Sequence, residues 1–165
     1  MSLLTKEQTK KFIESALKRA GKPYCWPCSD NSYSGKDLKG AKYPETYDCS
    51  GLVTCSLADA TIGDHQIDRR TVWNAQRLSE NCSQVNEPAP GDLCFYGPSW
   101  ALVTHVMIYV GPKHKEGVCF GSSGGDHRTV SPEVAQAMNA SVRGFKTHLY
   151  RGDFLGFGRL ETADE

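Results

Sequence analysis

A helical period of apolar residues opens the chain. Thr5 and Gln8 form a Thr-x-x-Gln capping box, a pairing that satisfies the free backbone groups at a helix start. The apolar face that follows contains Phe12, Ile13, Ala16, Leu17 and Ala20. Gly21 and Pro23 interrupt the period, because glycine favours helix ends and proline cannot continue a helix. The pattern predicts a first helix over about residues 6–20.

Two more helical stretches follow a long polar segment. Residues 25–47 have almost no periodicity and are rich in Ser, Gly, Asp, Asn, Lys and Pro, which predicts a long loop. A second helix is predicted to begin at Cys49 or Ser50 and to end near Gly63, and a third covers residues 71–78. The inward positions of the second helix are Leu52, Val53, Cys55 and Leu57.

The second half of the chain has the pattern of β-strands. Short runs rich in β-branched and aromatic residues, separated by Gly and Pro, predict strands at 92–96, 105–110, 118–122, 140–145 and 154–160. Before the fourth of these runs, Ser131 as N-cap and Pro132 at the first position predict a short helix through about Met138. Helices followed by an antiparallel sheet predict an α+β fold. A length of 165 residues fits one domain, residues 1–165.

Composition and charge narrow the classes of function. The chain is 39% hydrophobic, and no run approaches the roughly 20 apolar residues that span a bilayer. Nineteen basic residues balance nineteen acidic ones, which gives no global attraction to nucleic acid or to anionic lipid. We therefore expect neither a nucleic-acid nor a membrane partner, and we expect a monomer.

The N-terminus and the cysteines bear on the cellular compartment. Residues 1–20 are charged and amphipathic, without the apolar core of a secretory signal, so we expect synthesis in the cytoplasm. The chain has seven cysteines, an odd number, and is long enough to fold without disulfide bonds. Both observations favour a mostly reduced protein.

Cys49 is the first candidate for chemistry. It lies at the predicted start of the second helix, where free backbone N–H groups and the helix dipole stabilise a thiolate. Gly51 leaves room for a substrate to approach, and Asp48 has the type and position of an N-cap. The competing interpretation is a buried structural thiol.

His105 is the matching candidate for a general base, because a cysteine nucleophile needs a group that accepts and returns its proton. It opens a predicted strand, so the sheet can hold its ring rigidly toward the start of the second helix. The competing interpretation is a histidine that is simply hydrogen-bonded at a strand end.

Cys25 and Cys28 form a Cys-x-x-Cys pair, which invites a zinc or redox interpretation. A structural zinc site needs four ligands, and the sequence contains no second such pair and no matching pair of histidines. A thioredoxin-like site would follow a strand, whereas this pair follows a helix. We expect no metal and no cofactor.

Five pieces of the sequence, in order, resemble the NlpC-type cell-wall peptidases, which are small papain-fold cysteine enzymes. The pieces are YCW at 24–26, DCSGLV at 48–53, PGDLCFY at 90–96, THVMIYVG at 104–111 and VCFGSS at 118–123. Asp-Cys-Ser-Gly alone is moderately specific, but with the other pieces at suitable distances the resemblance is strong and spans most of the chain.

The resemblance implies a papain-like fold with Cys49 as nucleophile and His105 as general base. It further implies that Tyr24 borders the substrate cleft, with Ser50 as a second substrate-binding residue. Backbone N–H groups near Cys49 would then contribute to an oxyanion hole. Tyr24 and Trp26 also have a plainer interpretation as core aromatics.

The sequence departs from the family in two places. Family members usually place a third polar residue, often histidine, about a dozen residues after the base, and here Phe120 and Gly121 occupy the expected positions. Ser122 is the nearest polar residue in line, and Asp126 or His127 could reach back from the next loop. The second departure is WPCSD at 26–30, where the family usually has Trp-Gly-Gly, and it concerns substrate preference.

From the resemblance we expect a hydrolase that cuts peptidoglycan stem peptides, between γ-D-glutamate and the diamino acid. The N-acetylmuramoyl-L-alanine bond is the second choice. Two functions of different classes also fit the fold, namely a thiol acyltransferase and an inactive wall-binding module. Without a recognisable signal, we expect release to the wall by a phage, as a lysin or tail-associated hydrolase, or by a secretion machinery.

Overall fold

The computed structural model describes residues 4–26, 45–61 and 73–160. Its helices are α1 (Lys6–Leu17), α3 (Cys49–Ala60), α4 (Ala75–Glu80) and α5 (Pro132–Met138), with a short 3-10 helix η2 (His148–Tyr150). Its strands are β1 (Cys82–Val85), β2 (Leu93–Tyr96), β3 (His105–Tyr109), β4 (Cys119–Ser123), β5 (Ser141–Phe145) and β6 (Phe154–Leu160). Within the described ranges, no helix combines the length and apolar character needed to cross a membrane.

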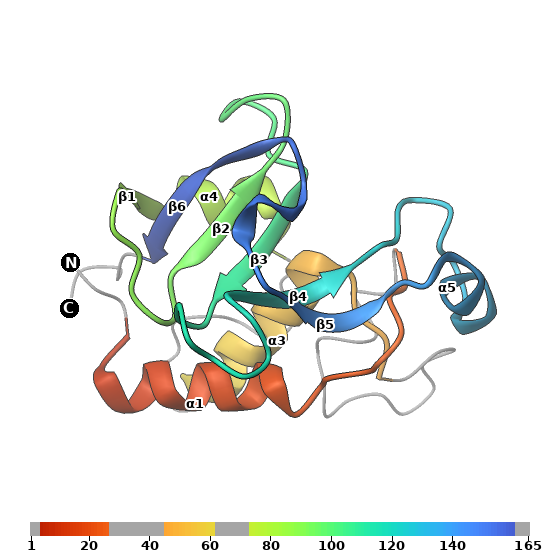
Figure 1. Ribbon diagram of the computed structural model, residues 1–165, viewed down its shortest axis with the longest axis horizontal. Coiled ribbons are helices and arrows are strands. Elements are labelled where there is room, and N and C mark those ends of the chain that lie inside the picture. The colour runs from red at the N-terminus through yellow and green to blue at the C-terminus, as the bar shows by residue number, and fades with distance from the viewer. Residues whose placement is uncertain (1–3, 27–44, 62–72, 161–165) are drawn as a thin grey trace.

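The six strands form one antiparallel sheet in the order β1-β6-β2-β3-β4-β5. Helices α1 and α3 lie side by side, and α3 packs on β3 and β4 at the centre of the sheet (Figure 1). Helix α5 lies beyond the sheet edge formed by β5 (Figure 1). The α+β fold predicted from the sequence, with N-terminal helices on an antiparallel sheet, is therefore confirmed.

Most predicted elements lie where their patterns put them. The Thr5–Gln8 capping box is present, and α1 begins at Lys6 but ends at Leu17, three residues earlier than predicted. Helix α5 and strand β6 have the predicted bounds. The third helix begins later than predicted, at Ala75, because Asn74 caps it by accepting a hydrogen bond from the Arg77 backbone N–H. Residues 27–44 of the predicted loop and residues 62–72 lie outside the described ranges.

Both faces of the sheet are buried, and β3 shows how its side chains are divided. Val106 and Ile108 join the main core, which also contains α1 and α3. Met107 and Tyr109 point to the opposite face and join a second, aromatic-rich cluster with Tyr96. This division follows from the alternation of side chains along a strand. This second cluster lies beside His105, the candidate general base.

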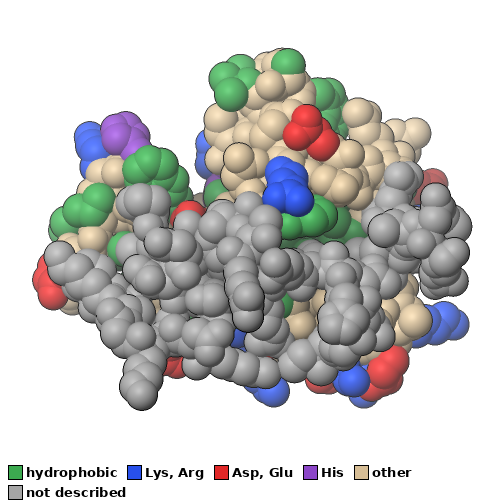
Figure 2. All heavy atoms as spheres, turned by 180° about the vertical axis from the view of Figure 1, so that it is seen from behind, with side chains coloured by type: hydrophobic (Ala, Val, Ile, Leu, Met, Phe, Trp, Pro, Cys, Tyr) green, Lys and Arg blue, Asp and Glu red, His purple; other side chains and the backbone are tan. Residues whose placement is uncertain are grey.

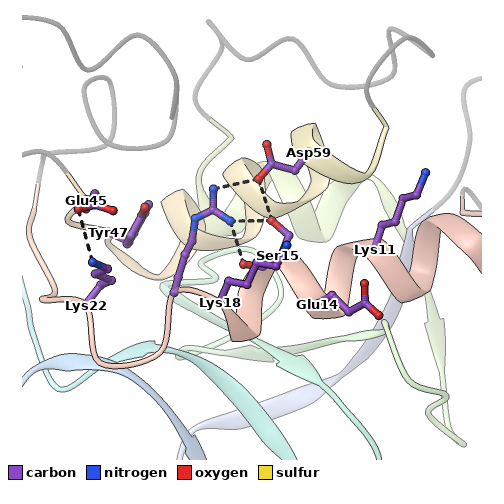
Figure 3. A pocket seen from close by; sticks show the side chains of 9 residues that line it. Lys11, Glu14, Ser15, Lys18, Lys22, Glu45, Tyr47 and Asp59 are labelled. Carbon is purple, nitrogen blue, oxygen red and sulfur yellow. Dashed lines mark hydrogen bonds and ion pairs between the residues drawn. The ribbon is translucent and has the colours of Figure 1, made fainter.

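A polar cluster fixes the position of α3, the helix that begins with Cys49. The Arg19 guanidinium donates to Asp59 Oδ2 at 2.9 Å, to the Ser15 hydroxyl at 2.6 Å and to the Cys55 sulfur at 2.9 Å. Ser15 also donates to Asp59 at 2.8 Å, so α1 and α3 are linked directly (Figure 3). The cluster borders a cavity of about 440 Å³ on the outer side of the two helices.

The surface agrees with the balanced charge of the sequence. On the face seen in Figure 2, charged side chains of both signs are scattered over the described part rather than grouped by sign. On this face, the described side chains therefore form no broad basic patch.

Candidate active site

Helix α3 begins with a complete N-cap that holds Cys49 in place. Asp48 has an extended backbone, and its Oδ1 accepts a hydrogen bond from the Gly51 backbone N–H at 2.6 Å. The Ser50 hydroxyl lies 3.5 Å from the same oxygen, so this side chain, predicted to bind substrate, faces the cap. Helix α3 follows this short polar cap and is buried along its length except at Asp59, so its first residue, Cys49, lies inside the protein.

Burial of the Asp48 carboxyl leads to a testable pH dependence of stability. Burial raises its pKa from 3.8 to about 6, against the lowering effect of the hydrogen bonds from Gly51 and Ser50. A carboxyl whose pKa is higher in the folded state contributes stability below the unfolded pKa, and this stability is lost as the pH rises through the folded pKa. The shift corresponds to roughly 3 kcal/mol of unfolding free energy between about pH 4 and pH 7.

We therefore expect Asp48→Asn to be relatively more stabilising at pH 7.5 than at pH 4. Asparagine keeps the cap but carries no charge at either pH. Urea unfolding of the wild type and the variant at both pH values measures the difference. If the substitution changed the unfolding free energy equally at the two pH values, the Asp48 carboxyl would not have the raised pKa that its burial predicts.

The Cys49 side chain is buried, and its environment differs from the one expected at a helix start. Burial raises its pKa from 9.0 to about 12, and the neighbouring Asp48 charge adds to this effect. Backbone N–H groups of Val106 and Ser50 hydrogen-bond to the sulfur and act in the opposite direction, as the helix start predicts. Because burial is the larger effect, the resting site holds a neutral thiol rather than the thiolate predicted from the sequence.

His105 is the first residue of β3 and is also buried. Burial lowers its pKa from 6.5 to about 3, and the positive charge of Arg151 acts in the same direction, whereas Asp153 opposes it. The imidazole is therefore neutral at physiological pH and can accept a proton. Its neighbour Val106 supplies the N–H that contacts the Cys49 sulfur, so the candidate nucleophile and the candidate base lie close together.

The His105 ring lies among aromatic side chains. Its Nε2 is 2.7 Å from the Tyr150 hydroxyl, and its centroid is 5.3 Å from that of Tyr96. Among the described residues, no hydrogen bond joins this ring directly to the Cys49 sulfur. Catalytic hydrogen bonds are often long without substrate and tighten when it binds.

The structure does not bring the two predicted third residues to His105. The Ser122 hydroxyl donates to the Tyr47 carbonyl oxygen at 2.7 Å and is fully buried there. The Asp126 carboxylate accepts hydrogen bonds from Arg128 on the surface. Successive residues of a strand point to opposite faces of the sheet. Ser122 therefore points away from His105, whereas its neighbour Ser123 lies on the same face as His105.

The side chain that contacts His105 Nε2 is Tyr150, which was not predicted from the sequence. It lies in η2, 45 positions along the chain from the histidine, in a segment without a strand or helix period. Of Phe120 and Gly121, which occupy the positions where the family usually has its third polar residue, Phe120 lies in the main core and Gly121 packs against Met107. No spacing rule connects these positions, so only the folded chain shows the contact.

Tyr24, which the resemblance implies at the border of a substrate cleft, lies close enough to Cys49 for the two groups to interact electrostatically. Its side chain is buried, and its pKa is raised by burial and by charge on Cys49, which places the phenol within electrostatic reach of the sulfur. A Cβ added at Gly125 would lie 2.2 Å from the Tyr24 ring, so this glycine lets the loop after β4 close over it. Trp26 is not a core aromatic, because 42% of its surface is exposed.

The cysteines do not form a metal site in the described part of the chain. Cys25 is disulfide-bonded and so cannot supply a zinc ligand, whereas Cys28 lies outside the described residues. Cys49, Cys94 and Cys119 are free thiols. Among the described residues, no group of three His, Cys, Asp or Glu side chains is placed to hold a metal.

Comparison with known proteins decides the family. The family model described as NlpC/P60 matches residues 21–149, which include both Cys49 and His105. The chain belongs to the NlpC/P60 family. The resemblance seen in the sequence is thereby confirmed.

Curated relatives of this NlpC/P60 chain carry endopeptidase names. The bifunctional muramidase/DL-endopeptidase CwlT of Bacillus subtilis is 35% identical over 102 residues, which are 60% of this chain and 26% of CwlT. The probable endopeptidase p60 of Listeria grayi is 30% identical over 96 residues, 58% of this chain and 15% of p60. The chain thus spans about a quarter or less of these two relatives.

Solved structures share the fold at low sequence identity. The peptidoglycan hydrolase RipB of Mycobacterium tuberculosis has a TM-score of 0.55 and 20% identity, over 93% of this chain and 65% of RipB. RipD of the same organism is described as a non-catalytic NlpC/p60 domain protein adapted to peptidoglycan binding. It has a TM-score of 0.56 and 19% identity, over 94% of this chain and 98% of RipD.

Proposed function

We propose that this NlpC/P60 chain is a cysteine endopeptidase that hydrolyses the stem peptides of peptidoglycan. The observation that carries the proposal is the placement of Cys49 at the start of α3, with its sulfur on the backbone N–H of Val106, next to the buried base His105. The endopeptidase names of two relatives that are at least 30% identical support the same class of reaction.

The proposed reaction follows from the neutral state of both groups. As the Cys49 sulfur attacks the scissile carbonyl, its proton passes to His105, and a carbon–sulfur bond forms. The imidazolium then protonates the leaving amine as the carbon–nitrogen bond breaks, which leaves a thioester on Cys49. Water, deprotonated by His105, hydrolyses the thioester and restores the thiol. Backbone N–H groups at the start of α3 are available to the oxyanion.

We infer that the cleaved bond joins γ-D-glutamate to the diamino acid. This is a bond between a D- and an L-centre, the kind named in the DL-endopeptidase part of CwlT. The second candidate is the N-acetylmuramoyl-L-alanine amide, which the same acyl-enzyme chemistry can cleave.

Digestion of purified sacculi, followed by mass spectrometry of the soluble fragments, tests the proposal. Cleavage at γ-D-glutamate releases fragments with a new amine on the diamino acid, whereas amidase cleavage frees the amine of L-alanine. We expect the first kind, and none from protein whose Cys49 has been alkylated. Sacculi that bind the protein but release no fragment would instead support a wall-binding module, the function described for RipD.

A thiol acyltransferase makes a different prediction. Its acyl-enzyme would be resolved by an amine or hydroxyl acceptor rather than by water, so product would form only when such an acceptor is added. Release of fragments from sacculi in plain buffer would exclude an acyltransferase.

A further inference from the structure

A side chain from η2 completes the surroundings of the candidate base. The Tyr150 hydroxyl oxygen lies 2.7 Å from His105 Nε2 and 3.0 Å from the Ser123 hydroxyl oxygen. Both distances are hydrogen-bonding distances, and the three groups come from η2, β3 and β4. The family match ends at residue 149, so Tyr150 is not part of the matched segment.

The Tyr150 ring is held firmly by its neighbours. It stacks on Phe145 with centroids 3.8 Å apart and planes within 9°, and it meets the edge of Tyr96 at 5.6 Å. The Thr147 hydroxyl caps the short helix by accepting from the Leu149 N–H at 3.1 Å. A tyrosine fixed on two sides keeps its hydroxyl at a constant place, which a positioning role requires.

The direction of the hydrogen bonds follows from the task of the histidine. Because Nε2 is hydrogen-bonded to Tyr150, Nδ1 is the nitrogen that can accept a proton from Cys49. Nδ1 must therefore be unprotonated in the resting site. The ring proton then sits on Nε2 and is donated to the Tyr150 oxygen. The phenol proton in turn is donated to the Ser123 oxygen, which keeps it from competing for Nε2.

We propose that Tyr150, supported by Ser123, is the positioning residue of this site and holds His105 in the tautomer whose Nδ1 accepts the Cys49 proton. The inference rests on the proposed function for its role in the reaction, but the hydrogen-bonded chain itself does not depend on any substrate.

The electrostatics of the site agree with a neutral acceptor. Burial raises the pKa of Tyr150, so the side chain is a phenol and not a phenolate at physiological pH. A neutral oxygen orients the imidazole without stabilising the imidazolium as strongly as a carboxylate would. The charged groups that act on His105 are Arg151 and Asp153, and these two form an ion pair at 2.9 Å. Tyr150 therefore fixes the orientation of the His105 ring without strongly favouring its protonated form.

Two variants and a matched control test the inference. Tyr150→Phe removes only the hydroxyl, and Ser123→Ala removes only the partner that orients it. Tyr109→Phe makes the same chemical change as the first variant in the same aromatic cluster, where its ring packs on Phe157. We expect Tyr150→Phe to lower kcat by about 10- to 100-fold, Ser123→Ala by less, and Tyr109→Phe to leave kcat unchanged; a general base as a whole contributes about 10²–10⁴-fold.

A spectroscopic measurement separates this inference from the proposed function. Nitrogen-15 NMR of the imidazole rings reports which nitrogen of His105 carries the proton, and the spectrum of His105→Gln identifies its signals among the five histidines. We expect a proton on Nε2 in the wild type and a mixture of tautomers in Tyr150→Phe. If the wild type cleaves no wall fragment, the proposed function fails but this spectrum still tests the contact. Wild-type kcat together with an unchanged His105 spectrum in Tyr150→Phe would overturn the inference.

Discussion

Replacing Cys49 with alanine should abolish the release of stem-peptide fragments. In the proposed reaction the sulfur forms the acyl-enzyme, and the adjacent Ser50 hydroxyl cannot replace it because it faces the Asp48 cap. We expect kcat/KM to fall by at least about 10⁴-fold, on the scale seen when hydrolases lose their nucleophile. Initial rates on sacculi or on purified muropeptides measure the effect.

Cys55→Ala is the matched control for this variant. Cys55 lies in the same helix and is equally buried, but its sulfur contacts Arg19 on the side of α1. We expect the control to lose some stability and to keep wild-type kcat. Fragment release by Cys49→Ala at the wild-type rate would refute the cysteine mechanism, and an equal loss in both variants would trace the effect to helix packing.

Local rules predicted much of the fold and identified both candidate residues, Cys49 and His105. Cap residues are short-range signals, so the starts of α1, α3 and α5 could be read from Thr5, Asp48 and Ser131. The motif around Cys49 and the strand that begins with His105 are equally local. These predictions succeed because each depends on residues within one or two turns of the chain.

Elements defined by distant partners were missed. Strand β1 consists of the residues CSQV, a short and mostly polar run, and it is a strand because β6 pairs with it at the sheet edge. The 3-10 helix η2 likewise depends on packing, since its Tyr150 stacks on Phe145. The contact between Tyr150 and His105 belongs to this class, which explains why the sequence pointed to Ser122 and Asp126 instead.

The ionisation state of the site also depends on the whole fold. A helix start favours a thiolate, and that local effect is present in the Ser50 N–H that contacts the Cys49 sulfur. Packing α3 against the sheet buries the sulfur and His105 together, and burial favours the uncharged form of each. In the proposed reaction both groups therefore begin neutral, so proton transfer to His105 has to accompany the attack by the Cys49 sulfur.

This neutral pair gives His105→Gln a large expected effect. Glutamine keeps a polar side chain that can hydrogen-bond to Tyr150, but it cannot accept the proton of a thiol whose pKa burial raises to about 12. We expect kcat/KM to fall by about 10²–10⁴-fold. Alkylation of Cys49 by iodoacetamide at pH 7 should slow as well, because the thiolate loses the base that helps to form it.

The partly exposed His114 offers the matched control for the histidine variant. Its ring lies in the turn between β3 and β4, where Nδ1 accepts from the Glu116 backbone N–H at 3.0 Å. His114→Gln should therefore keep both the wild-type kcat/KM and the wild-type alkylation rate. If His105→Gln also kept both, the imidazole would not be the base. If it lost hydrolysis but kept the alkylation rate, His105 would act only on the leaving amine, because that step requires a proton donor after the sulfur has already attacked.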